Sequence, residues 1–133
     1  RKYKIKNDKK YALKEIRIEQ QKLRNHLITN SPNICLLCRK KLPYFLLETA
    51  HIKPRCLLNY YDKNNYNNVI FLCRLCHVIF DKGYLGVSEN QLKISSKFNL
   101  YNYDLHDYTN IRIDVNKKTL PFFEFHYKFI YKN

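Results

Sequence analysis

The chain contains no methionine, not even at position 1, and no apolar run of the roughly 20 residues that a membrane-spanning helix needs. The missing methionine predicts that the sequence is a processed or trimmed piece, the C-terminal part of something longer. The N-terminus is basic but lacks an apolar core and a small-residue cleavage site, so it does not read as a signal peptide. We therefore expect an intracellular, cytoplasmic protein without a membrane partner.

Acidic residues are scarce, because 11 Asp and Glu face 25 Lys and Arg and leave a formal net charge of +14. Such an excess opposes compaction through self-repulsion, and it is typical of proteins that bind a polyanion such as nucleic acid. A Lys- and Asn-rich composition can also reflect an AT-biased genome. A basic membrane-surface protein is a further alternative, but the aromatic residues are spread along the whole chain instead of forming one amphipathic face.

The length of 133 residues suits one compact domain, and a hydrophobic content of 45% indicates a folded chain. The first predicted element is a helix over residues 8–28, with Asp8 as its cap and Pro32 in the segment that ends it. One stripe of this helix recurs at helical spacing: Leu13, Ile16, Gln20, Leu23 and Leu27. Basic residues surround the stripe, so the helix either lies across phosphates or packs with a solvated face.

The central part, residues 34–83, alternates short strand patterns with polar segments. Strands are predicted over 45–52 and 69–72, separated by a polar loop over 59–68 that contains three tyrosines. A short helix is predicted over 73–82, and Gly83 is placed to stop it.

Residues 84–133 predict a strand-rich extension and a terminal helix. Strand-like runs occupy 84–87, 92–95 and 111–115. Pro121 then precedes an aromatic run over 122–131, in which four apolar residues fit one helical face: Phe122, Phe125, Phe129 and Ile130.

Four of the five cysteines form two CxxC pairs, Cys35 with Cys38 and Cys73 with Cys76. Two such pairs complete a tetrahedral zinc site, and four thiolates leave no open position for water, so the predicted zinc is structural. Disulfides would suit a secreted chain, and a redox CxxC would need a thioredoxin-like setting, neither of which the sequence indicates. Cys56 is the remaining cysteine and is predicted to be an ordinary thiol.

Two histidines and an aspartate lie between and after these pairs. His77 and Asp81 are four residues apart, so on a helix they share one face and can hold one divalent ion. His51 lies near the end of the strand predicted over 45–52, and Asn68 lies between the two histidines. Each residue alone has an ordinary structural explanation, but their combination beside two CxxC pairs indicates a catalytic site.

These motifs resemble the HNH nucleases of the ββα-metal fold. The resemblance runs from Cys35 to about Gly83 and is closest to the class with an AHIxP motif and a CHxxFDxG ending, found in bacterial restriction and modification-dependent endonucleases. It extends more weakly through Leu120 and Pro121 to the aromatic run that contains His126.

The resemblance implies an α+β fold: a small ββα-metal core stapled by a four-cysteine zinc site, with flanking N-terminal and C-terminal helices in a single domain over residues 1–133. It implies a DNA endonuclease that leaves a 5′-phosphate and a 3′-hydroxyl. His51 would be the general base, Asn68 would orient it, and His77 and Asp81 would hold Mg²⁺ or Mn²⁺. Four basic residues are predicted to contact DNA: Lys53, Arg55, Arg74 and Lys82.

One position departs from many HNH enzymes, because Ala50 stands where Asp or His supplies a further metal ligand. The AHIxP class has the same alanine, and Glu48, Thr49 or water would substitute. A non-catalytic, zinc-stapled nucleic-acid-binding module is the main alternative, since charge and cysteines fit it equally well. A zinc deaminase would need HxE ahead of PCxxC, which the sequence lacks. A double-strand cut at a palindrome would imply a homodimer.

Overall fold

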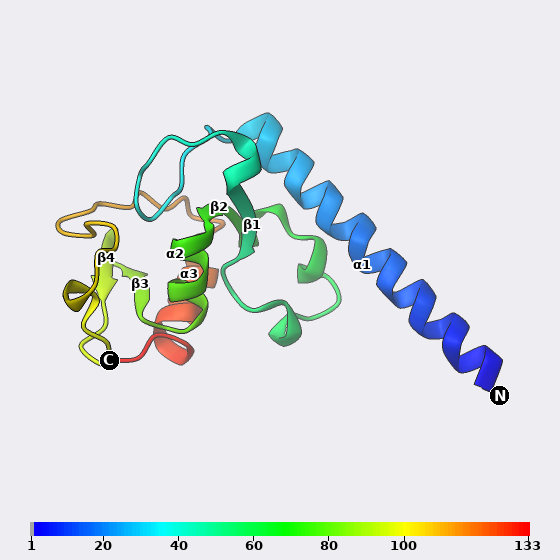
Figure 1. The fold of residues 1–133 in the computed structure, drawn as a ribbon. Helices are drawn as coiled ribbons and strands as arrows, with labels where there is room; N and C mark the ends of the chain where they lie inside the picture. The colour runs from blue at the N-terminus through cyan, green and yellow to red at the C-terminus, as the bar shows by residue number, and fades with distance from the viewer. Residues whose placement is uncertain (1) are drawn as a thin grey trace.

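The computed structural model describes residues 2–133, with side chains described from residue 9 onward. The helices and strands follow in this order: α1 (Lys2–Asn30), β1 (Leu47–His51), β2 (Val69–Cys73), α2 (Arg74–Asp81), β3 (Leu85–Ser88), β4 (Gln91–Ile94) and α3 (Leu120–Phe129). In Figure 1, α1 extends to one side of the β1–β2 pair, and the β3–β4 pair lies on the other side.

The centre of the fold is a ββα unit made of β1, β2 and α2. The two strands are antiparallel, with Leu47 opposite Cys73 and His51 opposite Val69. Every residue of β2 is buried, and α2 begins immediately after it, with Cys73 as the N-cap whose Sγ accepts from the Cys76 N–H. The predicted α+β class with a ββα core is therefore confirmed, and the predicted strands and short helix lie within a few residues of their expected places.

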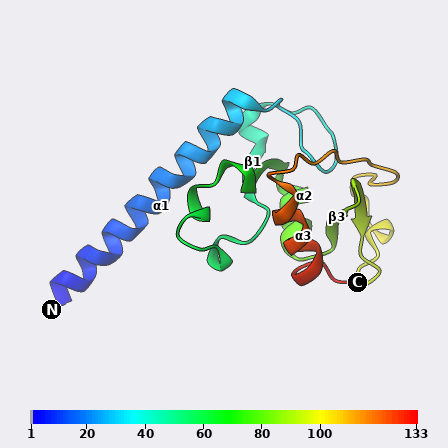
Figure 2. The same cartoon turned by 180° about the vertical axis from the view of Figure 1, so that it is seen from behind.

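Helix α1 starts earlier than predicted and packs along only part of its length. It begins at Lys2, so position 8 lies inside the helix and is not its boundary. Leu23 and Leu27 are buried, but Leu13 is 58% exposed, so the predicted apolar stripe is wrong at that end. Figures 1 and 2 give the reason, because the N-terminal part of α1 extends beyond the body of the protein.

Arg24 fixes the packed end of α1 to the start of the ββα unit. Its Nη1 donates to the Leu47 carbonyl and its Nη2 to the Tyr44 carbonyl, both at 2.7 Å. Because the guanidinium holds two carbonyl groups that precede or begin β1, the helix sets where this strand starts.

The extension after α2 is a β3–β4 hairpin, and the predicted strand over 111–115 is wrong. The hairpin turns at Glu89 and Asn90, which both have positive φ. The later segment touches it through a single bridge between Gln91 and Arg112. Apolar alternation at Ile111 and Ile113 therefore reflects burial against the hairpin and not a continuous ladder.

Helix α3 packs against β3, where Gly86 lets it approach closely. A Cβ on Gly86 would lie 2.8 Å from the Tyr131 ring. The buried face of α3 consists of Phe122, Phe123 and His126, whereas Phe129 is 61% exposed. The predicted face is therefore only partly right, because a polar residue, His126, takes the central buried position that periodicity assigned to Phe125.

The turn after α2 holds the end of α3. Gly83 has a φ of 82°, a conformation that favours glycine, and it follows α2 as predicted. Its carbonyl accepts from the Lys132 N–H at 2.8 Å, and a Cβ at this position would collide with the carbonyl of Ile130.

Within residues 2–133, no helix has both the length and the apolar character to cross a membrane.

Candidate functional site

The four cysteines of the two CxxC pairs converge, as predicted. Their Sγ atoms all lie within 4.8 Å of one another, and three of the four residues are buried. A zinc ion bound by four thiolates at about 2.3 Å separates them by roughly 3.8 Å, so the cluster needs only a small contraction. The donor set is the one that zinc prefers, and the four cysteines could hold such a metal. Cys56 is exposed and stands apart from the cluster.

The protonation energetics of the cluster fit a bound cation. Burial raises the pKa of Cys38 to about 12, with neighbouring thiols adding to the effect. Hydrogen bonds with Cys35 and Cys73, followed by burial, raise the pKa of Cys76. Hydrogen bonds with Cys73 and Cys76 lower the pKa of Cys35. The protein alone therefore favours a thiolate at Cys35 and neutral thiols at Cys38 and Cys76, and a divalent cation would supply the charge that stabilises four thiolates.

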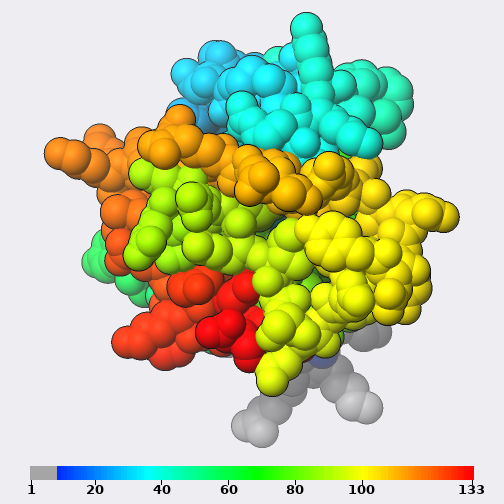
Figure 3. Space-filling view, turned by 90° about the vertical axis from the view of Figure 1, so that its left-hand side faces the viewer, coloured from blue at the N-terminus to red at the C-terminus, as the bar shows by residue number. Residues whose placement is uncertain are grey.

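A segment far along the chain completes the surroundings of the cysteines. The Tyr108 hydroxyl lies 3.0 Å from Cys76 Sγ, and His106 Nε2 lies 3.7 Å from Cys73 Sγ. Lys40 Nζ donates to His106 Nδ1 at 3.0 Å, so the His106 proton sits on the nitrogen that faces the sulfur. Figure 3 shows the segment around residues 105–119, in yellow to orange, running as a band beside the cyan loop of the first cysteine pair.

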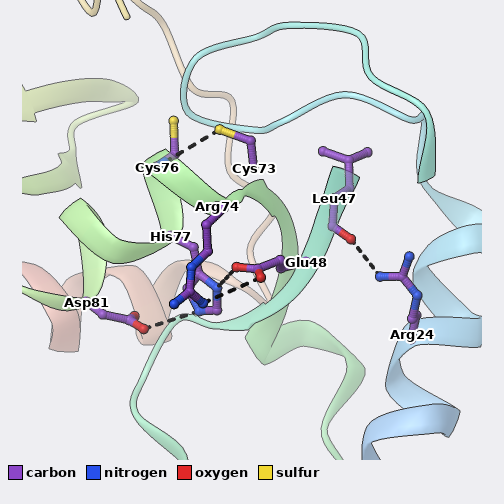
Figure 4. Close-up of polar contacts among 8 residues, drawn as sticks. All are labelled: Arg24, Leu47, Glu48, Cys73, Arg74, Cys76, His77 and Asp81. Atoms are coloured by element: carbon purple, nitrogen blue, oxygen red, sulfur yellow. Dashed lines mark hydrogen bonds and ion pairs between the residues drawn. The ribbon is translucent and has the colours of Figure 1, made fainter. Parts of the chain in front are cut away.

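On the other side of α2, His77 lies between two carboxylates (Figure 4). Its Nδ1 is 2.8 Å from Glu48 Oε1 of β1, and its Nε2 is 3.2 Å from Asp81 Oδ2 of the same helix. Arg74 Nη1 approaches the other oxygen of Glu48 at 3.5 Å. The hydrogen bond to Asp81, together with that to Glu48, raises the pKa of His77 despite its partial burial.

The His77 and Asp81 atoms fit two neighbouring ligands of one hard divalent ion. Ligands at about 2.1 Å in octahedral geometry lie roughly 3.0 Å apart, close to the 3.2 Å between His77 Nε2 and Asp81 Oδ2. Glu48 would then play the outer part of a carboxylate–histidine–metal arrangement, which fixes the ring and its tautomer. Glu48 therefore contacts His77 directly instead of replacing the ligand that Ala50 lacks.

His51 ends β1 and lines the same cavity as His77 and Asp81. This cavity has a volume of about 460 Å³, and residues of α1, β1, α2 and α3 and of the loop after β1 form its wall. The wall consists of Gln20, Thr49, His51, Pro54, Arg55, His77, Asp81, His126 and Ile130. Burial lowers the pKa of His51, so its imidazole is neutral near pH 7.

Asn68 holds the loop after β1 and does not touch the His51 ring. The side chain is fully buried, its Oδ1 accepts from the Lys53 N–H at 2.8 Å, and its Nδ2 donates to the Lys53 carbonyl at 3.1 Å. The Asn68 carbonyl also accepts from the Ile52 N–H. Asn68 thus fixes the two residues that follow His51.

The four basic residues predicted to meet DNA have different surroundings. Arg55 is held by Glu19, with Nε 2.7 Å from the carboxylate, and Lys53 Nζ lies 4.2 Å above the Phe125 ring. Arg74 and Lys82 are exposed at the two ends of the short helix α2. Arg74 pairs with Glu48 at 3.5 Å on an exposed surface, whereas the contact between Arg55 and Glu19 of α1 is partly buried.

Two residues of the site were not predicted from the sequence. Glu19 is a buried acidic residue in a polar, basic helix, and its partner Arg55 is 36 residues away. His126 lies in an aromatic run, and its only signal was the weak resemblance of the terminal segment. Arg55 pairs with Glu19, and His126 Nε2 lies 2.9 Å from the Phe80 carbonyl. Neither pairing follows a local spacing rule, so the periodicity of the sequence could not have revealed them.

Comparison with known proteins agrees with this geometry. Residues 35–88 match a family model described as HNH endonuclease. The match spans both cysteine pairs, His51, His77 and Asp81, and supports the HNH family and with it a nuclease-type function on nucleic acid. No curated protein matches the chain.

Proposed function

We propose that the chain is a DNA endonuclease of the restriction type, in the AHIxP class of HNH enzymes, and that it hydrolyses phosphodiester bonds with one divalent metal ion. A single observation carries the proposal: His51, a half-buried imidazole whose pKa is lowered by burial, lines one cavity with His77 and Asp81, a pair spaced to hold a hard cation. A module that only binds nucleic acid needs no such combination.

In this proposal His51 is the general base that takes a proton from the attacking water. His77 and Asp81 would hold Mg²⁺ or Mn²⁺, which would supply positive charge to the scissile phosphate and the leaving oxygen. Glu48 keeps the His77 ring oriented through Nδ1. Asn68 keeps His51 in place through the backbone of Lys53. The products carry a 5′-phosphate and a 3′-hydroxyl.

The zinc held by the four cysteines is structural in this proposal, and residues 1–133 act as one unit. Both flanking helices support that view, because Gln20 of α1 and His126 of α3 line the same cavity as His51. The net charge of +14 draws the protein to DNA, and Arg74 and Lys82 contact phosphates beside α2. Lys53 and Arg55 contribute at the mouth of the cavity.

The proposal is tested by incubating the protein with supercoiled plasmid and Mg²⁺ or Mn²⁺ and sequencing the product ends. His51→Ala should lower the single-turnover rate by about 100-fold or more and leave DNA binding intact. His77→Ala and Asp81→Ala should respond partly to extra metal, whereas His51→Ala should not. His26→Ala is a matched control, because His26 stacks on Tyr66 outside this cavity.

The alternative, a non-catalytic binding module, makes a different prediction. It expects DNA binding without metal-dependent cutting, and no difference between His51→Ala and wild type in any cleavage assay. A wild-type cleavage rate for His51→Ala would overturn the assignment of the general base.

A further inference from the structure

Three residues in the wall of the cavity that contains His51 each carry a buried polar atom without a hydrogen-bond partner. Across the residues whose side chains are described, the buried side-chain nitrogen and oxygen atoms without a hydrogen-bond partner are Thr49 Oγ1, His51 Nε2 and His126 Nδ1. All three residues belong to the wall of the same cavity of about 460 Å³. Buried polar groups are nearly always paired, so their gathering in one place indicates a bound polar molecule.

His126 belongs to the cavity wall and carries an unprotonated ring nitrogen. Its Nε2 lies 2.9 Å from the Phe80 carbonyl, which can only accept, so the ring proton sits on Nε2 and Nδ1 carries a free lone pair. The residue is 1% exposed, and its ring stacks on Phe80 with centroids 3.7 Å apart. Burial lowers the pKa of His126 to about 4, which keeps this nitrogen an acceptor at neutral pH.

We propose that His126 Nδ1 accepts a hydrogen bond from the water that attacks the scissile phosphate, as a second imidazole beside His51. The inference rests on the proposed nuclease function and adds a residue from α3, outside the segment that matches the HNH family model.

Water has two hydrogens, and the two ring nitrogens take one each. His51 Nε2 accepts the proton that leaves as the water oxygen bonds to phosphorus. His126 Nδ1 accepts the hydrogen that stays on this oxygen, and its own protonation does not change. The bond from phosphorus to the 3′-oxygen breaks, and this oxygen takes its proton from solvent. Because both hydrogens are held, a lone pair of the water faces the phosphorus.

A metal-ligand role for His126 fits the geometry less well. Among the described residues, the four cysteines are the only group of three or more potential ligands whose donor atoms lie within 4.8 Å of one another. His126 Nδ1 therefore does not form such a group with His77 and Asp81, although all three line the cavity.

Two substitutions distinguish the role of His126 Nδ1 from that of His126 Nε2. His126→Gln places an amide near the position of Nε2 and can keep the bond to the Phe80 carbonyl, but it loses the Nδ1 acceptor. His126→Asn keeps an acceptor near the position of Nδ1 and loses the bond to Phe80. Thermal unfolding gives the folded fraction of each variant, and single-turnover cleavage is then compared per folded molecule, with DNA affinity measured in parallel.

The proposal predicts that His126→Gln is more stable than His126→Asn but cuts DNA more slowly. Its rate per folded molecule should fall up to about 100-fold below that of wild type, at unchanged DNA affinity. His126→Asn should be less stable yet faster per folded molecule than His126→Gln. A purely structural His126 predicts the opposite order of rates, and that result would overturn the inference. If the wild type does not cut DNA at all, the nuclease function itself fails, which is a different outcome.

Two further measurements test whether the water is shared. In the His51→Ala background, His126→Gln should cost less than in wild type, because both residues act on one molecule. If the rate loss of the double variant equals the product of the losses of the two single variants, the two residues act independently and do not share a water. The Mg²⁺ concentration for half-maximal rate should not change in His126→Gln, and a large increase would assign His126 to the metal instead.

Discussion

Replacing Asn68 with alanine should destabilise the protein by about 2–4 kcal/mol. The change removes two hydrogen bonds, at 2.8 and 3.1 Å, and leaves the N–H and the carbonyl of Lys53 without their partners. Each net hydrogen bond contributes about 1 kcal/mol, and each buried group left unpaired costs about 1–3 kcal/mol. Lys53 is only half-buried, so water recovers part of that cost and the sum stays below the upper limit.

The assay is urea unfolding of the zinc-loaded protein, followed by circular dichroism. A loss of this size corresponds to a lower Tm of roughly 10 °C for a chain of this length. Asn68→Asp is informative, because the carboxylate keeps the acceptor for the Lys53 N–H but turns a second oxygen toward the Lys53 carbonyl. It should destabilise at least as much as the alanine variant at pH 7.

The neighbouring Asn67 provides the control. Its Nδ2 donates to Asn65 Oδ1 at 3.0 Å in a partly exposed loop, so Asn67→Ala should cost less than about 1 kcal/mol. If Asn68→Ala and Asn67→Ala lose the same stability, the clamp on Lys53 is not what holds the loop after His51, and the explanation is wrong.

Three other predictions concern metal, pH and salt. Elemental analysis should find one tightly held zinc per chain; Cys38→Ser or chelation should unfold the protein, while Cys56→Ser, at an exposed thiol, should not. Because burial depresses the pKa of His126 to about 4, the unfolded state binds its proton first, and stability should fall by about 2 kcal/mol as the pH drops from 6.5 to 5. His126→Phe should lack this part of the pH dependence, and parallel curves for the two proteins would contradict the assignment. DNA affinity should fall steeply with salt, with a log–log slope of roughly −4 to −7, and Arg74→Gln should reduce the slope by about 1. A flat salt response would show that the basic residues are not the binding surface.

The ββα core was predictable because its signals are local. The CxxC spacing brings two thiols of each pair together, the four-residue spacing places His77 and Asp81 on one helical face, and Gly83 marks the end of that helix. Each of these rules acts within a few residues. The structure then needs only the pairing of β1 with β2 to bring the parts into one site.

The walls of the site were not predictable, because the contacts that build them are not local in the sequence. His126 meets Phe80 across 46 residues, and Arg55 meets Glu19 across 36. Periodicity also failed where burial was uneven: Leu13 fits the helical stripe but lies on the part of α1 that extends beyond the body. The segment around Ile113 fits a strand, but it joins the hairpin through an isolated bridge at Arg112. Which faces meet across long separations depends on packing that no local pattern records.

The way the cavity wall is assembled limits how the protein can be shortened or transplanted. A fragment cut to residues 35–88 would keep the cysteines, β1, β2 and α2, and would still carry His51, His77 and Asp81. It would lose Gln20 on one side of the cavity and His126 and Ile130 on the other, so the space beside His51 would be open to bulk solvent. The complete cavity wall therefore needs the chain from the middle of α1 through the end of α3, and a graft of residues 35–88 alone would carry His51, His77 and Asp81 without the residues that enclose them.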